Sequence, residues 1–271
     1  MPKADAHSRI EVNMEAEVLI IGGGIAGVST AFALAQLGRR VVVLERGEVA
    51  SEASGLNAGH IGALGWGHEP GLESHLTMGS LELFRKMQLD MGYDIEFRQC
   101  GGLEAVQTDA QMEYAQERVR SLRERGYTLE ILGPRQAASI EPAINPRLPG
   151  FIYAPLRGKA NPVLATRAFA SAAQESGARI VTGCPVTRID HDGCLHRVRG
   201  GKEEFVAGVL VIVAGAWSAQ VGRMLGLVVP IVPVRGQMWA TAPMPSTLFH
   251  ALSSTESVSY THLTLPTKRI V

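Results

Sequence analysis

The chain has 271 residues, of which 46% are hydrophobic, and its 26 basic residues balance its 26 acidic residues. This length and composition are typical of a globular protein with a sizeable core, in one large domain or two smaller ones. The zero net charge argues against a broad nucleic-acid-binding surface, because such a surface needs a basic excess. The three cysteines lack C-x-x-C spacing, which fits a reducing cytoplasm, and the histidines show no metal-ligand spacing.

The first 16 residues are polar and lack the apolar core of a signal peptide, so we expect a flexible tail. No apolar run approaches the roughly 18 residues of a membrane span. The sequence therefore predicts no integral membrane segment.

A glycine-rich turn follows the first aliphatic run, Val18–Ile21, and precedes an alanine-rich segment typical of a helix. In a G-x-G-x-x-G turn, the first glycine permits a tight bend and the second lets a pyrophosphate approach the backbone. The third lets the helix pack closely on the strand. Free amides at the helix N-terminus attract phosphate. The predicted cofactor-binding residues of this turn are Gly22, Gly24, Ile25, Ala26 and Gly27.

A second buried strand, 40–44, ends on Glu45, roughly 20 residues beyond the first glycine. An acid at this spacing accepts hydrogen bonds from ribose hydroxyls and repels a 2′-phosphate. The fingerprint predicts an adenine dinucleotide but does not separate NAD from FAD. The next segment, 47–67, is rich in glycine and small residues, which suggests backbone lying against an extended ligand.

The later segments alternate between helix and strand patterns. Residues 71–149 are richer in charge, with two helical patterns, strands around a glycine turn at 101–102, and a further strand at 127–132. Pro162–Gly177 is typical of an amphipathic helix. We then expect a hairpin over 195–206, a separate buried strand at 209–213 and a helix over 217–225.

Four segments in this order resemble the FAD-dependent amine and amino-acid oxidoreductases, which include D-amino-acid dehydrogenases, glycine oxidase and sarcosine oxidase. They are the fingerprint with Glu45, "ASGLNAGHI" (53–61), "GKANPVLATRAFASAAQESGARI" with "PVTRI" (158–189), and "VLVIVAGAWSAQVGRMLG" with "PVRGQ" (209–237). The resemblance implies an FAD cofactor. It also implies an α/β fold, with a Rossmann-like FAD-binding domain, an inserted α+β substrate domain and a truncated C-terminus.

The resemblance also implies a role for individual residues. Glu45 and Arg46 would hold the adenosine ribose region, and Val186 would clasp the adenine through its backbone. Some relatives attach the flavin to a histidine near the position of Asn57, so we expect noncovalent FAD here. The pyrophosphate, ribityl chain and flavin would be lined by Ser54, Asn57, Ala58, Gly59 and His60, and a second return to FAD would use Ala214, Gly215 and Trp217.

The implied domain boundaries place the FAD-binding domain at 17–70 and 150–227 and the substrate domain at 71–149 and 228–256. Residues 257–271 do not look like the rest of the chain. One set of codons for this segment resembles adapter DNA used in sequencing libraries. We therefore expect a non-native tail there.

The resemblance implies oxidation of a C–N bond in an amino acid or secondary amine, with hydride transfer to flavin N5. Oxygen, a quinone or a protein would accept the electrons. Arg235 is a candidate clamp for a substrate carboxylate or a structural arginine, and His60 is a candidate acid/base or a residue that packs by the flavin. An NAD-dependent dehydrogenase and an inactive FAD-binding fragment are the alternatives.

Overall fold

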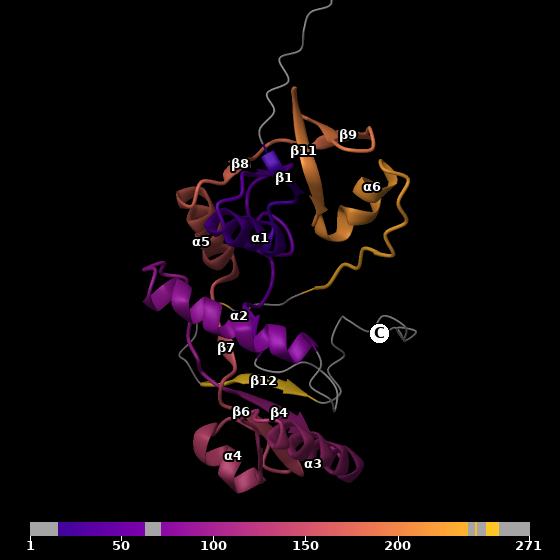
Figure 1. Cartoon of the computed structure of the whole chain (residues 1–271). Coiled ribbons are helices and arrows are strands. Elements are labelled where there is room, and N and C mark those ends of the chain that lie inside the picture. Colours follow the sequence, from indigo (N-terminus) through magenta and orange to yellow (C-terminus); the bar gives the residue numbers. More distant parts are fainter. Residues whose placement is uncertain (1–15, 63–71, 238–241, 243–247, 255–271) are drawn as a thin grey trace, which may run out of the picture. The chain divides into compact units, whose positions relative to one another are not determined.

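The computed structural model describes residues 16–62, 72–237, 242 and 248–254 (Figure 1). The chain divides into two compact units. Unit 1 contains Met1–Ala58 and Pro162–Trp239, and unit 2 contains Gly59–Asn161 and Ala240–Val271. The predicted non-native tail lies outside the described residues, as does the predicted N-terminal tail apart from Ala16.

Unit 1 is built on a six-stranded sheet in the order β8-β2-β1-β11-β10-β9. The first four strands are parallel, whereas β10 runs antiparallel to both of its neighbours. Leu19 and Ile20 are fully buried, as expected for a parallel strand covered on both faces. The strands are β1 (Ala16–Ile21), β2 (Val41–Leu44), β8 (Arg179–Val181), β9 (Val186–His191), β10 (His196–Gly200) and β11 (Glu203–Ile212).

The predicted hairpin and the predicted strand after it share one long strand, β11. Its first half pairs with β10 and its second half pairs with β1. The sequence predicted a hairpin that ends at 206 and a separate strand that begins at 209, whereas β11 continues without a break through Gly208. Pairing on opposite sides of the two halves therefore overrides the weak strand propensity of glycine.

Two helices of unit 1 pack against each other, α1 (Ile25–Gln36) and α5 (Pro162–Glu175) (Figure 1). Their alanine-rich faces allow close approach, and the rings of Phe32 and Phe169 meet edge to face with centroids 6.1 Å apart. A 3₁₀ turn, η1 (Gly215–Trp217), then leads directly into α6 (Ser218–Arg223).

Unit 2 contains a four-stranded sheet in the order β12-β4-β6-β5, with a separate two-stranded pair, β3 and β7. Strand β12 runs parallel to β4, and the other pairs are antiparallel. A capping box at Thr108 and Gln111 begins α3. The elements are β3 (His60–Ile61), α2 (Leu72–Leu89), β4 (Gly102–Val106), α3 (Asp109–Glu124), β5 (Glu130–Leu132), α4 (Pro134–Ile140), β6 (Gly150–Ala154), β7 (Gly158–Lys159) and β12 (Ala251–Ser254).

The boundaries of the two units differ from those of the predicted domains. Residues 150–161 belong to unit 2, because β6 pairs with β4 and β5. Residues 228–237 belong to unit 1, because the chain after α6 folds back on that helix. The Leu227 amide donates to the Gly222 carbonyl at 3.0 Å, and a Cβ at Gly222 would lie 2.5 Å from Val229.

Candidate functional site

The glycine turn between β1 and α1 has no room for side chains at two of its motif positions. Gly22 has a φ of +122°, and a Cβ there would lie 2.4 Å from the Val213 carbonyl oxygen at the end of β11. A Cβ at Gly27 would lie 1.9 Å from the Gly22 carbonyl oxygen. Glycine therefore permits both the bend and the close packing of α1, as the motif predicts.

The N-terminus of α1 presents backbone amides that helix geometry leaves without intrahelical partners. The Ile25 amide donates to Ser54 Oγ at 3.0 Å. Among the residues that the structure describes, the amides of Ala26 and Gly27 have no hydrogen-bond partner. A Cβ at Gly24 would lie 2.9 Å from Ser54 Oγ, so only glycine leaves this approach open. These amides and the helix dipole form a site that favours an anion.

Glu45, at the end of β2, is buried with 8% exposure, and its carboxylate is fixed by backbone amides. Its Oε2 accepts from Gly23 N at 2.6 Å, and its Oε1 accepts from Gly47 N at 2.8 Å. A Cβ at Gly23 would lie 2.8 Å from the Glu45 side chain. Sequence reasoning missed Gly23 and Gly47, although each is a glycine beside a residue that the motif singles out.

The loop that contains Ser54 and Asn57 is held by its own backbone and by α5. Thr166 Oγ1 of α5 donates to the Pro162 carbonyl at 2.8 Å and lies 3.4 Å from the Ser54 carbonyl. Asn57 Nδ2 donates to the carbonyls of Ala53 and Ser54 at 3.0 and 3.1 Å. Ala58 ends the unit 1 part of this loop and is exposed. The structure thus brings Ser54 to the helix N-terminus and turns the Asn57 amide back onto its own loop.

The residues after β11 lie beside the end of β2. Trp217 of η1 stacks under Arg46, whose Cζ is 3.6 Å from the ring centroid. Arg46 also pairs with Glu52 at 2.5 Å. Gly215, with a φ of +52°, is the residue that allows this turn to follow Ala214. The Arg46–Trp217 contact was not predicted, because no local spacing relates the two positions.

The remaining predicted site residues lie in other elements than the glycine turn and the loop that contains Ser54. Val186 begins β9 and pairs with Gly200. Arg235 is exposed in the coil after α6. Gly59 and His60 belong to unit 2, where His60 pairs with Lys159. Partial burial lowers the pKa of His60, and the positive charges of Arg157 and Lys159 lower it further.

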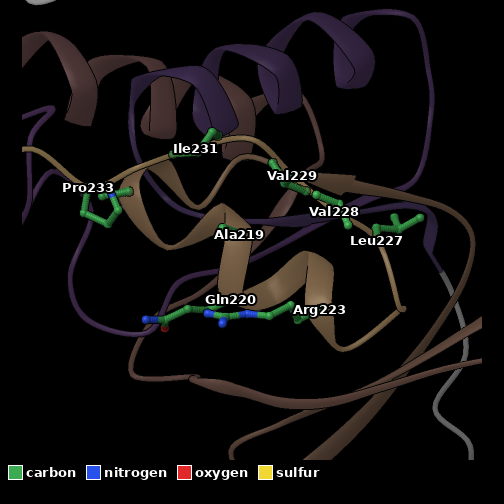
Figure 2. A pocket seen from close by; sticks show the side chains of 9 residues that line it. Ala219, Gln220, Arg223, Leu227, Val228, Val229, Ile231 and Pro233 are labelled. Atoms are coloured by element: carbon green, nitrogen blue, oxygen red, sulfur yellow. The ribbon is translucent and has the colours of Figure 1, made fainter. Parts of the chain in front are cut away.

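A cavity of about 360 Å³ lies between α6 and the chain that follows it (Figure 2). Its walls are mostly apolar and include Ala219, Leu227, Val229 and Ile231. None of the glycine-turn residues lines this cavity, so it is not the predicted phosphate site.

The residues of unit 1 fit the diphosphate and sugar of FAD. The unpaired amides of Ala26 and Gly27 suit the negative oxygens of a diphosphate. The ordered carboxylate of Glu45 suits the hydroxyls of a ribose. The described residues contain no group of His, Cys, Asp and Glu that could hold a metal ion. Among the same residues, no helix is both long and apolar enough to cross a membrane.

The sequence profile of the family DAO, "FAD dependent oxidoreductase", matches residues 17–270. The chain belongs to this family, which confirms the predicted fold class and the predicted FAD cofactor.

Individual relatives support the same assignment. The chain is 30% identical to "Dimethylglycine dehydrogenase, mitochondrial" of Mus musculus over 85% of this chain and 26% of that protein. It is 28% identical to "D-amino acid dehydrogenase" of Neisseria meningitidis over 81% of this chain and 66% of that protein. The structure of glycine oxidase from Geobacillus kaustophilus superposes with a TM-score of 0.77 at 26% identity, covering 89% of this chain and 66% of that one. The chain thus spans from a quarter to two thirds of these relatives.

Proposed function

We propose that this chain is the FAD-binding part, with at least part of the substrate domain, of an enzyme that oxidises the C–N bond of an amino acid or secondary amine. The observation that supports this most is the combination in unit 1 of unpaired amides at α1 with the ordered Glu45 carboxylate. The names of the relatives, which include D-amino acid dehydrogenase and glycine oxidase, favour amino-acid substrates.

We propose that unit 1 binds the cofactor without a covalent bond and that unit 2 carries substrate-binding residues. Bound FAD supplies the acceptor for a hydride from the carbon beside the amine nitrogen. The amides of Ala26 and Gly27 hold the diphosphate, and Glu45 accepts hydrogen bonds from the ribose. Ser54 Oγ and the Arg46–Trp217 stack orient the loops beside this ligand.

His60 is the proposed base. Since its pKa is lowered, its imidazole is neutral near pH 7 and can take a proton from a substrate ammonium. The resulting neutral amine is the form from which a hydride leaves readily. We propose a cytoplasmic location, with oxygen, a quinone or a protein as the final electron acceptor.

The test uses the FAD-loaded chain under anaerobic conditions with glycine, sarcosine, D-alanine, D-proline and a polyamine. We expect at least one of the amino acids to bleach the flavin absorption, and turnover to follow when oxygen or an artificial dye is added. A loaded chain that none of these compounds bleaches would support the inactive FAD-binding fragment instead. Arg235→Ala should raise the KM for carboxylated substrates alone if Arg235 is a clamp; equal losses for a polyamine would make it structural.

A further inference from the structure

Three basic side chains of unit 2, His60, Lys159 and Arg98, occupy one row across neighbouring segments, and we call them the basic row. His60 of β3 lies directly opposite Lys159 of β7 in an antiparallel pair. Arg98 lies opposite Lys159 on its other side, through an isolated antiparallel bridge. Side chains directly opposite each other in antiparallel pairing share one face. The three basic groups therefore lie on the same face of this small patch.

The backbone fixes how closely the members of the row approach. Arg98 and Lys159 exchange both backbone hydrogen bonds, at 2.8 and 2.9 Å. Because both polar backbone groups of Lys159 are used in this way, His60 and Lys159 form a non-hydrogen-bonded pair. Cα atoms in such pairs lie about 4.5 Å apart, with the side chains at their closest. The row is thus held by register and not by flexible loops.

The basic row is not neutralised within the described part of the chain. All three side chains are exposed, and neither Lys159 nor Arg98 has an ion pair with another described residue. Glu96, two residues before Arg98, accepts a hydrogen bond from Asn161 at 3.2 Å. Like charges placed opposite one another destabilise a sheet. Repulsion between these positive charges therefore destabilises the patch, and a bound anion would reduce that repulsion.

A fourth cation adds to the positive field. The positive charges of Arg157 and Lys159 both lower the pKa of His60. Arg157 donates to Ser253 Oγ at 3.1 Å, and its buried Nε has no hydrogen-bond partner in the described structure. The acid beside it, Glu104, pairs with Arg118 at 3.2 Å. The net charge of the side chains around His60 is therefore positive.

We propose that Lys159 and Arg98 bind the carboxylate of the substrate, so that the site selects amino acids over amines without a carboxylate. The inference rests on the proposed function, because it concerns the substrate of that reaction. A guanidinium can bind a carboxylate through two hydrogen bonds, and a lysine adds a point charge. In an amino acid the ammonium is attached to the carbon beside the carboxylate. The neutral imidazole of His60, next to Lys159, is placed to accept its proton.

The test follows the His60 ring signals by NMR while acetate, acetamide or inorganic phosphate is added to the full chain, with and without FAD. We expect acetate to shift these signals and acetamide to leave them unchanged. Lys159→Met and Arg98→Met should each weaken acetate binding about tenfold, since each removes a charge-assisted contact. The matched controls, Lys86→Met and Arg135→Met, remove exposed charges elsewhere in unit 2 and should bind acetate as the wild type does.

Two further readouts separate binding from folding. The melting temperatures of the two row variants should match or exceed that of the wild type, because each variant removes like-charge repulsion. Lys159→Arg keeps the charge and should keep acetate binding. If a methionine variant fails to fold, loss of acetate binding in a folded Lys159→Arg variant would contradict the role of the charge.

The outcomes distinguish this inference from the proposed function. A chain that retains FAD but binds acetate equally in the row variants and the wild type overturns the inference and leaves the proposed function standing. Tighter binding of phosphate than of acetate overturns the carboxylate assignment. A chain that binds acetate through the row but retains no FAD contradicts the proposed function, and with it the role of the row in catalysis.

Discussion

The proposed cofactor cradle of unit 1 and the basic row of unit 2 are built in different ways. The cradle consists mainly of backbone amides and one acid within a single strand–turn–helix–strand segment, Ala16–Glu45. The basic row collects side chains from three segments that are distant in sequence, around positions 60, 98 and 159. The first arrangement uses glycine to expose backbone groups, and the second uses strand register to align charged side chains. The comparison predicts that cradle variants alter folding and cofactor binding, whereas row variants alter substrate choice.

The largest expected effect is on the close packing within the cradle. Gly27→Val places a side chain where even a Cβ would lie 1.9 Å from the Gly22 carbonyl oxygen. We expect a loss of about 3 kcal/mol or more in unfolding free energy, measured by urea denaturation, because the contact is with backbone that cannot yield easily. Gly79→Ala is the control, since it has open space inside α2 and should be neutral or slightly stabilising. Equal stability of the two variants would contradict the packing argument.

The next effect is on FAD affinity. Glu45→Gln keeps the shape of the side chain but removes the charge that accepts from Gly23 and Gly47. Hydrogen bonds to charged groups contribute about 1.5–3 kcal/mol, so loss of the charge-assisted bonds that Glu45 is proposed to accept from the ribose should raise the Kd for FAD about 10- to 100-fold. Fluorescence titration with FAD measures this. Glu48→Gln, an exposed neighbour, should leave the Kd unchanged, and an unchanged Kd for Glu45→Gln would remove this residue from the site.

Ser54→Ala should have a moderate effect on stability. The hydroxyl accepts from the Ile25 amide in the manner of a helix N-cap, although it comes from a loop distant in sequence. Loss of such a cap costs about 1 kcal/mol, which thermal denaturation of the FAD-free chain would show. Ser51→Ala serves as the control in the same loop. If FAD binding removes the difference between Ser54→Ala and the wild type, the ligand has taken over the amides of α1.

A smaller effect is expected at the Arg46–Trp217 stack. An exposed cation–π contact contributes about 0.5–1 kcal/mol, and the Arg46–Glu52 ion pair adds little because both side chains are nearly half exposed. Arg46→Met should therefore destabilise the chain only slightly while changing the fluorescence of Trp217. Arg39→Met, which removes a comparable surface ion pair, should leave that fluorescence as it is.

The smallest effect is a pH dependence from His60. Its pKa is lowered in the folded state, so the unfolded chain takes up the proton first as the pH falls. The stability from this group is complete above the ordinary histidine pKa of about 6.5 and decreases below it. Lys159→Met removes one cause of the shift, so the pKa of His60 should rise in an NMR titration and the decrease should become shallower. An unmoved pKa would contradict the register of the basic row.

The strands, the glycine turn and the helix of the proposed cradle were largely predictable because they are close in sequence, while the cofactor contacts of these residues stay a prediction. The spacing of Gly22, Gly24 and Gly27 before an acid-terminated strand indicated the turn, the helix and the ligand class. The amides of Gly23 and Gly47 escaped prediction, since no motif says which backbone groups hold Glu45 in place. In physical terms, local spacing encodes the turn but not the hydrogen-bond partners of its acid.

The domain boundaries and the basic row were less predictable because they depend on pairing between distant segments. Strand β6 joins unit 2 through β4 and β5, which the composition of 150–161 does not reveal. His60 was singled out from the sequence, but its neighbours Lys159 and Arg98 were not, because β3 and β7 have only two residues each. Pairs this short leave no periodic pattern in a sequence.

The most direct test of the central claim is equilibrium binding of FAD and NAD to the purified chain. The account predicts that FAD binds at one site per chain, gives visible flavin absorption after removal of free ligand, and is not displaced by NAD. A colourless chain that binds NAD in preference to FAD would contradict it.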